Sequence, residues 1–230
     1  MEQQRMEVFL ELFREEPPLY IQELEKEALA DEVPIIRRGT RDVLRFLLRT
    51  RRPQRILEVG TAVGYSSLFM ASCLPEDSRI TTIEKVPMRY EQAQKNFVRY
   101  DKKDQITLEI GDAADVLTQL NQKQMKFDFI FMDAAKGQYL NFLPDIMELL
   151  NVGGILVSDN TLHDGDVLES RYAVTRRDRT IHGRMREYLQ VITHHPQLET
   201  LCLSVGDGMT ISYKLDGGYH EKTGDSCSSQ

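Results

Sequence analysis

The sequence predicts an α/β protein built on a seven-stranded, mostly parallel sheet that ends in an antiparallel hairpin and is preceded by helices. Three patterns lead to this prediction. Short apolar runs alternate with helical patterns between residues 55 and 158, and such alternation is typical of parallel strands joined by right-handed helical crossovers. A glycine-containing turn, Gly60 to Gly64, joins the first run to a helical pattern. Two further β-rich runs flank Gly206-Asp207-Gly208, which indicates a hairpin.

The individual elements follow from hydrophobic spacing and turn residues. Residues 2–31 contain two helical patterns separated by Pro17-Pro18, and a helical stripe of apolar residues runs from Pro34 to Thr50. We expect strands at 55–59, 79–84, 105–110, 127–132 and 153–158, and helices at 65–73, 87–100, 113–120 and 137–150. A helix at 178–194 precedes the hairpin strands at 198–205 and 209–215.

The length of 230 residues suits one domain with a short extension. We expect an N-terminal helical arm at 1–33, one α/β domain at 34–215 and a disordered polar tail at 216–230. The first 16 residues mix Glu and Arg with apolar positions, unlike a signal peptide, and no apolar run has the length of a membrane span. The 3 widely spaced cysteines are typical of reduced thiols. These features predict a cytoplasmic protein with no membrane partner.

Charge is distributed unevenly along the chain. The net charge of −7 argues against indiscriminate binding to nucleic acid. Eight arginines and one acid lie between residues 37 and 55, however, and six arginines and one acid lie between 171 and 186. Arginine clusters of this kind suit contacts with phosphates. The alternative for the first zone is that Arg41, Arg45 and Arg49 line the solvated face of a helix and pair with the acidic N-terminal segment.

The turn after the first strand is the first candidate site. It comprises Glu58-Val59-Gly60-Thr61-Ala62-Val63-Gly64-Tyr65-Ser66, and Glu84 ends the next strand, 24 positions after Gly60. A carboxylate at that place accepts hydrogen bonds from both hydroxyls of a ribose. The turn lacks the glycines of a dinucleotide site and the Lys of a triphosphate loop. It suits a cofactor with an amino-acid end and no phosphate, which is S-adenosyl-L-methionine. The alternative is a tight turn and a solvated strand end without a ligand.

Two later strands bring a second polar group to the same edge of the sheet. Asp133 and Lys136 follow the strand at 127–132, and Asp159 and Asn160 follow the strand at 153–158. The carboxyl ends of parallel strands form the ligand crevice of an open sheet, and two carboxylates with an amide oxygen suit Mg²⁺. The alternative is that Asp133 caps a helix and that Asp159-Asn160 forms a turn. Beside a divalent cation, Lys136 in its amine form is a candidate general base.

These motifs resemble those of the metal-dependent O-methyltransferases, the family that includes catechol and caffeoyl-CoA O-methyltransferases. The resemblance covers residues 34–215 and is carried by Leu57 to Thr61, Gly64-Tyr65-Ser66, Asp133-x-x-Lys136 and Asp159-Asn160. It implies a Rossmann-like fold of the S-adenosylmethionine methyltransferase type. Within the family, the chain is most similar to the bacterial tRNA 5-hydroxyuridine methyltransferases, and this closer similarity is carried by Asp133 to Tyr139, Arg176-Arg177, His195-Pro196 and Val205 to Gly208.

The resemblance implies a role for each candidate residue. Lys136 and Asp133 would be catalytic, with Lys136 as the base, and Mg²⁺ or another divalent cation would be bound by Asp133, Asp159 and Asn160. Asp112 lies in a turn that fits adenine, although it also suits the cap of the next helix. Position 134 is Ala where catechol enzymes have a His, so contacts there are expected to differ. The cofactor would contact Ile36, Glu58, Gly60, Ser66, Glu84, Asp112, Ala113 and Asp133.

Three functions remain open. The 5-hydroxyl and 4-carbonyl of 5-hydroxyuridine, or the vicinal oxygens of a catechol, can each chelate one cation. The resemblance favours methylation of 5-hydroxyuridine at the wobble position of tRNA, which gives 5-methoxyuridine, with Arg176 and Arg177 as tRNA contacts. The alternatives are methylation of small catechol or caffeoyl-CoA-like phenols and, more remotely, a non-catalytic scaffold that binds nucleic acid. A homodimer built partly from the N-terminal helices is expected.

Overall fold

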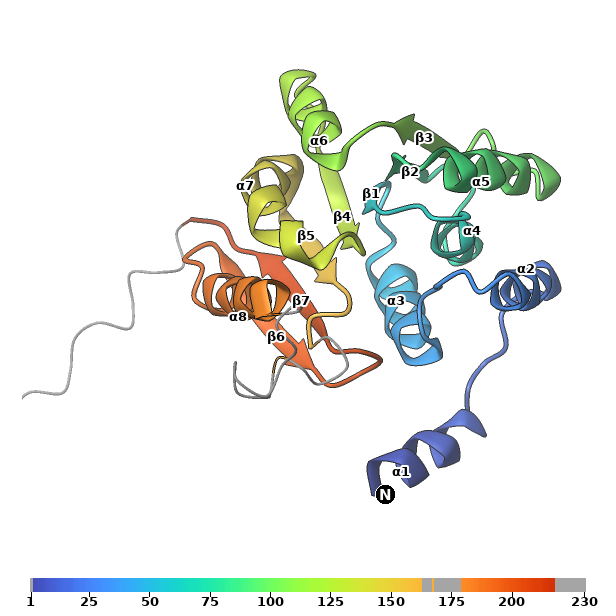
Figure 1. The fold of residues 1–230 in the computed structure, drawn as a ribbon. Helices are drawn as coiled ribbons and strands as arrows, with labels where there is room; N and C mark the ends of the chain where they lie inside the picture. Colours follow the sequence, from blue (N-terminus) through green and yellow to red (C-terminus); the bar gives the residue numbers. More distant parts are fainter. Residues whose placement is uncertain (1, 163–166, 168–178, 218–230) are drawn as a thin grey trace, which may run out of the picture.

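Seven strands form a single sheet in the order β3-β2-β1-β4-β5-β7-β6 (Figure 1). The computed structural model describes residues 2–162, 167 and 179–217. The first five strands run parallel, whereas β7 is antiparallel to both β5 and β6. The predicted fold class is confirmed, including the terminal hairpin. The strands are β1 (Arg55–Val59), β2 (Arg79–Glu84), β3 (Ile106–Ile110), β4 (Phe127–Met132), β5 (Leu150–Ser158), β6 (Leu198–Leu203) and β7 (Met209–Lys214).

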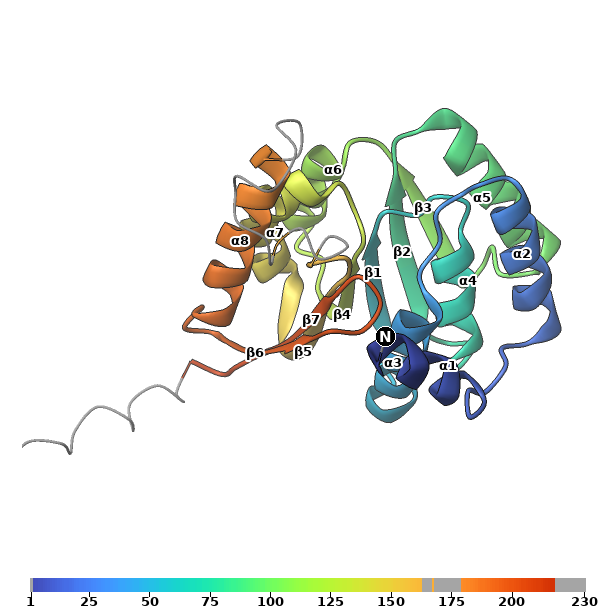
Figure 2. The same ribbon diagram turned by 60° about the horizontal axis from the view of Figure 1, so that its bottom comes forward.

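Helices cover both faces of the sheet (Figure 2). One face packs against α3, α4 and α5, and the other packs against α6, α7 and α8. The helices are α1 (Glu2–Glu11), α2 (Leu19–Ala30), α3 (Arg38–Arg51), α4 (Tyr65–Ser72), α5 (Pro87–Arg99), α6 (Ala113–Gln122), η1 (Lys136–Gln138, a 3-10 turn), α7 (Tyr139–Leu149) and α8 (Arg179–Thr193). Among the described residues, no helix is both long and apolar enough to cross a membrane.

Alternating residues of the central strands fill the two layers between the sheet and the helices. In β4, Ile130 and Met132 belong to the cluster under α6, α7 and α8, whereas Phe129 and Phe131 belong to the cluster on the opposite face. All four side chains are 0% exposed, and β4 is apolar throughout because both of its faces are covered. A slip of one residue would exchange these layers, so burial sets the register and the position of Asp133 after β4.

The N-terminal arm predicted at 1–33 contains a helix that packs on the domain. Ile21 and Leu24 of α2 are buried in the same cluster as Leu68 and Phe69 of α4. The polar tail was predicted to begin at residue 216, and its residues from 218 onward lie outside the described part of the chain.

Two element boundaries near the site differ from the prediction. The helix predicted at 137–150 begins as η1 and becomes α-helical only at Tyr139, and glycine at position 137 disfavours an earlier start. Strand β5 begins at Leu150, three residues before the predicted start at 153, and Leu150 pairs with Phe127 across a register shift. The low strand propensity of Asn151 and Gly153 concealed this extension.

Candidate active site

A cavity of about 730 Å³ lies at the carboxyl ends of the parallel strands. Strand β1 lies between β2 and β4, so the turns that follow these strands meet at one edge of the sheet (Figure 1). The chain entering α3 and the turn between β6 and β7 complete the wall. The predicted site residues on the wall are Ile36, Gly60, Ser66, Glu84, Asp112, Ala113, Asp133, Asp159 and Asn160.

The turn after β1 lies so close to the turn after β4 that residue 60 has no room for a side chain. Gly60 has φ +109°, and a Cβ atom there would lie 2.0 Å from the carbonyl oxygen of Asp133. The two turns are joined by the N–H of Asp133, which donates to the oxygen of Val59 at 3.0 Å. Glycine at this position is therefore required by packing and backbone conformation, and it also exposes main chain to the cavity.

Main-chain donors hold Glu84 in place. Its Oε2 accepts from the N–H of Ala62 at 2.9 Å, and its Oε1 accepts from the N–H groups of Lys85 and Val86 at 2.9 and 3.0 Å. The side chain is 8% exposed and lines the cavity. A carboxylate has about four acceptor sites, so Glu84 retains capacity for a ligand hydroxyl while it joins the end of β2 to the glycine turn.

Asp112 caps α6 and also borders the cavity. Its Oδ1 accepts from the N–H of Ala114 at 3.1 Å, and its Oδ2 accepts from Nζ of Lys85 at 3.0 Å. The hydrogen bond from Lys85 is the main cause of a lowered pKa for Asp112. The two functions considered for Asp112 are thus compatible, because Asp112 and Ala113 both lie on the cavity wall.

Glu58 was predicted to contact the cofactor, but it is not among the residues that line the cavity. It is 0% exposed and accepts hydrogen bonds from the hydroxyls of Ser67 and Thr82. Its Oε1 has no hydrogen-bond partner among the described residues. Burial raises the pKa of Glu58 to about 7. The geometry therefore gives Glu58 a supporting place behind the glycine turn.

The ends of β4 and β5 bring Asp133, Asp159 and Asn160 together. Nδ2 of Asn160 donates to Oδ1 of Asp133 at 2.9 Å, and the N–H of Asn160 donates to Oδ1 of Asp159 at 2.9 Å. Asn160 has φ +57°, a left-handed conformation that is uncommon outside glycine. One strained residue thus contacts both carboxylates.

The surroundings of these two carboxylates disfavour negative charge. Burial, together with the neighbouring charge of Asp133, raises the pKa of Asp159 to about 7. Burial also raises the pKa of Asp133, and the charge of Lys136 opposes this rise. A divalent cation would offset the repulsion, and the two carboxylates with the amide oxygen of Asn160 are a donor set that fits Mg²⁺. No cluster of three His, Cys, Asp or Glu residues suited to a metal occurs in the described part of the chain, and this set contains only two such residues.

Lys136 begins η1, three residues after Asp133. Among the described residues, those that line the cavity do not include Lys136, although its charge acts on Asp133. Tyr139 anchors the other end of this turn. Its buried hydroxyl lies 3.0 Å from the carbonyl oxygen of Asp159 and 3.2 Å from that of Met132. The turn that carries Lys136 is thereby fixed to the ends of β4 and β5.

Three residues of the site were not identified from the sequence. Arg37 and Asp207 line the cavity and form an ion pair with an N–O distance of 2.5 Å. Oγ1 of Thr40 donates to Oδ1 of Asp159 at 3.2 Å. Thr40 lies in an arginine-rich helix, and Asp207 lies in a hairpin turn. A structural role in these elements was enough to explain both residues, so neither was assigned to the site. The only signal for Asp207 was its place in the segment 205–208 that carries the closer family resemblance.

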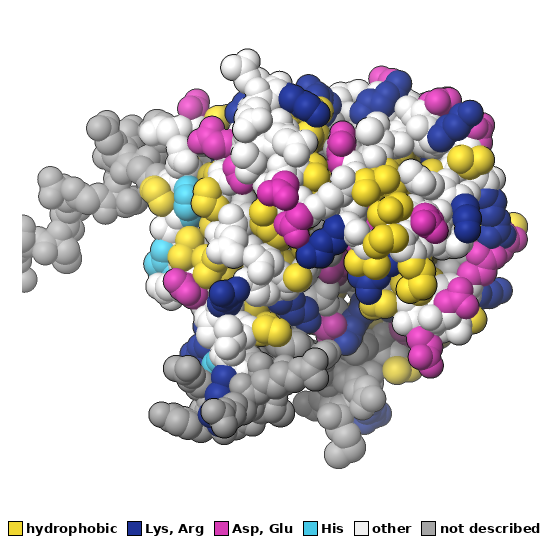
Figure 3. Space-filling view, turned by 45° about the horizontal axis from the view of Figure 1, so that its top comes forward, with side chains coloured by type: hydrophobic (Ala, Val, Ile, Leu, Met, Phe, Trp, Pro, Cys, Tyr) yellow, Lys and Arg dark blue, Asp and Glu magenta, His cyan; other side chains and the backbone are white. Residues whose placement is uncertain are grey.

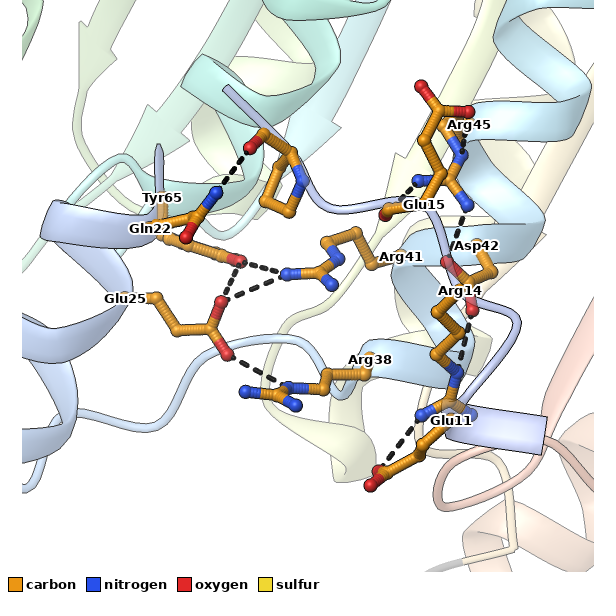
Figure 4. Close-up of polar contacts among 11 residues, drawn as sticks. Glu11, Arg14, Glu15, Gln22, Glu25, Arg38, Arg41, Asp42, Arg45 and Tyr65 are labelled. Atoms are coloured by element: carbon orange, nitrogen blue, oxygen red, sulfur yellow. Dashed lines mark hydrogen bonds and ion pairs between the residues drawn. The ribbon is translucent and has the colours of Figure 1, made fainter. Parts of the chain in front are cut away.

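A buried arginine connects the N-terminal helices to the cavity wall (Figure 4). Arg41 of α3 is 1% exposed and donates to Oε2 of Glu25 at 2.9 Å and to the hydroxyl of Tyr65 at 3.3 Å. Tyr65 lines the cavity. Arg49, by contrast, is half exposed and pairs with Glu15 at 3.0 Å. Arg49 therefore matches the solvated alternative for the first basic zone. Arg41 also pairs with the acidic N-terminal segment, but it is buried rather than solvated.

The second basic zone is described only in part. Arg176 and Arg177 lie outside the described residues, so their contact with tRNA stays a prediction. Figure 3 shows one face of the molecule on which the basic and acidic side chains of the described residues are interspersed. The mixed charge of this face therefore does not indicate a binding site for a polyanion such as tRNA.

Known proteins match the chain over most of its length. A family model described as O-methyltransferase matches residues 14–215. Caffeoyl-CoA O-methyltransferase 1 of Eucalyptus globulus is 34% identical over 175 residues, covering 75% of this chain and 71% of the relative. Catechol O-methyltransferase of Niastella koreensis is 37% identical over 127 residues, covering 55% and 58%. The structure of SAH-bound methyltransferase PaMTH1 of Podospora anserina has a TM-score of 0.82 at 25% identity, covering 94% of this chain and 96% of that one. The matched residues include the glycine turn, Glu84 and both acidic strand ends.

Proposed function

Since the chain belongs to the O-methyltransferase family, we propose that it transfers a methyl group from S-adenosyl-L-methionine to a hydroxyl that lies beside a second oxygen atom. One observation carries this proposal. Gly60 and Glu84 line the same cavity as Asp133, Asp159 and Asn160. The residues assigned to the ribose-containing cofactor and the oxygen ligands assigned to a metal ion thus line one cavity.

Different residues of the cavity wall bind different parts of the methyl donor. S-adenosyl-L-methionine supplies an electrophilic methyl group on its sulfonium sulfur. We assign its ribose hydroxyls to Glu84, its amino-acid end to the main chain of the glycine turn and Ser66, and its adenine to Asp112-Ala113. Ile36 adds an apolar contact from the chain before α3. Because Glu84 is already fixed by three main-chain donors, little ordering is required when the ribose binds.

The second group of residues acts on the acceptor. A divalent cation held by Asp133, Asp159 and Asn160 would supply Lewis-acid chemistry, which lowers the pKa of the acceptor hydroxyl. Asn160 restrains both carboxylates through its side chain and its N–H. Lys136, in its amine form, accepts the hydroxyl proton at Nζ. Tyr139 restrains the turn that carries Lys136, and this alignment of base and acceptor contributes to the rate.

For the acceptor we propose 5-hydroxyuridine in tRNA. The segments that carry the closer resemblance to tRNA-modifying enzymes, 133–139 and 205–208, both contribute to the cavity wall through Asp133, Gln138 and Asp207. The second candidate is a small phenol, and it is supported by the named relatives that act on caffeoyl-CoA or catechol. Both candidates present two adjacent oxygens, so the donor set alone does not distinguish them.

A test with four acceptors separates these functions. Labelled S-adenosyl-L-methionine and Mg²⁺ are incubated with tRNA that contains 5-hydroxyuridine, the same tRNA with uridine, catechol, or caffeoyl-CoA. We expect label in the first acceptor and none in the second. Label in a phenol alone would identify a small-molecule enzyme, and cofactor binding without any transfer would favour a scaffold. Asp159→Asn should abolish transfer and leave cofactor affinity nearly unchanged, whereas the exposed control Asp104→Asn should retain both. Full turnover after exhaustive EDTA treatment would contradict the metal assignment.

If the acceptor is tRNA, we expect Arg176 and Arg177 to contact its phosphates. Replacing both with Ala should weaken tRNA binding and flatten its salt dependence, because each lost phosphate contact removes up to about one unit from the slope of log K against log salt. Replacing Lys102 and Lys103 with Ala removes the same charge elsewhere and is the matched control. If the slopes of the two double variants agree, this arginine pair does not contact phosphates.

A further inference from the structure

Three chain segments meet at Thr40, a residue with no assigned role. Thr40 lies in the first turn of α3, is 0% exposed, and donates through Oγ1 to Oδ1 of Asp159, which is 2% exposed. The two residues are 119 positions apart in the chain. A buried hydroxyl that donates to a carboxylate forms a charge-assisted hydrogen bond.

The turn between β6 and β7 packs behind Thr40. Gly206 has φ +61°, and a Cβ atom there would lie 2.8 Å from Oγ1 of Thr40. A Cβ atom on Gly39 would similarly lie 2.8 Å from Cγ1 of Val205. The same turn accepts two hydrogen bonds from the chain after Asn160, because the N–H groups of Thr161 and Leu162 donate to the oxygens of Gly208 and Asp207 at 2.8 and 2.9 Å. Thr40 and Asp159 are therefore held against one rigid turn.

The hydrogen bonds to the carboxylate of Asp159 all involve the same oxygen. Oδ1 accepts both from Thr40 and from the N–H of Asn160, and no donor among the described residues bonds to Oδ2. The carboxylate lines the cavity. Two donors on Oδ1 fix the rotation of the carboxylate, so Oδ2 is the oxygen left for a ligand.

We infer that Thr40 is a positioning residue that orients the carboxylate of Asp159 for a divalent cation, an inference that rests on the metal site of the proposed function. Groups that hydrogen-bond to a metal ligand fix its orientation, and their removal typically lowers metal affinity by about 10–100-fold. Thr40 acts on the cation through Asp159 and has no part in binding the methyl donor.

The test compares Thr40→Val with Thr40→Ser. Valine retains the shape of threonine without its hydroxyl, whereas serine retains the hydroxyl. Binding of Mn²⁺ alone is measured by calorimetry, binding of S-adenosylhomocysteine is measured separately, and melting temperatures record folding. We expect Thr40→Val to lower Mn²⁺ affinity about 10-fold or more, Thr40→Ser to restore it, and both variants to bind S-adenosylhomocysteine as wild type does.

Two results would overturn the inference and leave the proposed function intact. One is wild-type Mn²⁺ affinity in folded Thr40→Val. The other is an equal loss in both variants, which would show that methyl packing rather than the hydroxyl orients Asp159. If wild type itself binds no Mn²⁺ but binds S-adenosylhomocysteine, the metal assignment of the proposed function fails, and the role of Thr40 fails with it. If Thr40→Val does not fold, Thr40→Ala takes its place in the comparison, with Thr40→Ser still required to bind as wild type does.

Discussion

Two glutamates at the ends of neighbouring strands have opposite environments. Glu84 lines the cavity, and three main-chain N–H groups donate to its carboxylate. Glu58 is enclosed behind the turn, and its Oε1 has no hydrogen-bond partner among the described residues, so burial favours the protonated form. The first glutamate suits the recognition of a ligand, whereas the second suits support of the turn.

Glu84→Ala should weaken binding of the methyl donor by about 1–3 kcal/mol, the range for hydrogen bonds to a charged group. The substitution removes the acceptor for the ribose hydroxyls and also frees the N–H of Ala62. Calorimetric titration of S-adenosylhomocysteine measures the loss, and Glu91→Ala on the exposed side of α5 is the control. Unchanged affinity in Glu84→Ala would assign the ribose to another residue.

Glu58 should make stability depend on pH. Its pKa rises from the usual 4.5 to about 7 on folding. The folded state therefore retains a proton that the unfolded state loses, and the resulting stabilisation is complete below pH 4.5 and is lost as the pH rises to about 7. A tenfold change in proton affinity is about 1.4 kcal/mol, so the loss is on the order of 3 kcal/mol.

Denaturant unfolding of wild type and Glu58→Gln from pH 4.5 to pH 8, in EDTA, checks this dependence. The free energy of unfolding of Glu58→Gln relative to wild type should rise across this interval, because the amide does not ionise. The exposed control Glu91→Gln should follow wild type. Parallel curves for Glu58→Gln and wild type would show that this carboxyl does not carry the pH dependence.

Helix α3 connects the acidic edge of the cavity to α2 and α4. Its first turn contacts Asp159 through Thr40, and Arg41, one residue later, contacts Glu25 of α2 and Tyr65 of α4 (Figure 4). Arg41 also lies over the ring of Phe69 at 5.9 Å. The guanidinium is nearly inaccessible to water, so its charge depends on these neighbours.

Glu25→Ala should lower the free energy of unfolding by about 3–5 kcal/mol, because it leaves the buried charge of Arg41 without its partner. Glu23 lies on the same helix, is 61% exposed in its side chain, and reaches Arg99 only at 4.0 Å. Glu23→Ala is therefore a matched control, with an expected change within about 0.5 kcal/mol. Similar losses in the two variants would mean that α2 packing, rather than the ion pair, carries the effect.

At the scale of the whole molecule, the N-terminal segment leaves apolar surface uncovered. Val8, Phe9, Leu10, Leu12 and Phe13 are 54–78% exposed. Arg14 pairs with Asp42 at 2.9 Å, so the end of this segment is attached to α3. A contiguous apolar surface of this kind is typical of an interaction site, and we propose that a second copy of the chain covers it.

The expected assembly is a homodimer, measured by light scattering on a size-exclusion column. Phe9→Glu with Phe13→Glu should yield a monomer, because charge introduced at the centre of an apolar interface is not solvated. Val98→Glu introduces a single carboxylate at an apolar residue that is 65% exposed on α5 and should leave the assembly unchanged. A wild-type monomer, or a dimer in the double variant, would contradict this arrangement.

The sequence predicted the strands and their polar ends because both are local features. Apolar runs followed by Gly60, Glu84, Asp133 or Asp159 are visible in a few adjacent residues, and the rules for parallel sheets bring their ends to one edge. Thr40, Arg37 and Asp207 were not identified because their partners lie far away in the chain. Glu58 was predicted to contact the cofactor, but it is buried and is not among the residues that line the cavity. Spacing does not show whether an acid beside a glycine turn faces the ligand or the interior.

The last hairpin completes the acidic edge of the cavity from residues that are translated after the donor-binding elements. Gly60 and Glu84 precede residue 85, whereas the turn at 205–208 that packs against Thr40 and bonds to the chain after Asn160 follows them in the sequence. Polypeptides leave the ribosome from the N-terminus. A nascent chain that stops before β6 therefore contains the donor-binding elements without the packed acidic edge. Methyl transfer is therefore expected to require the pairing of β7 with β5.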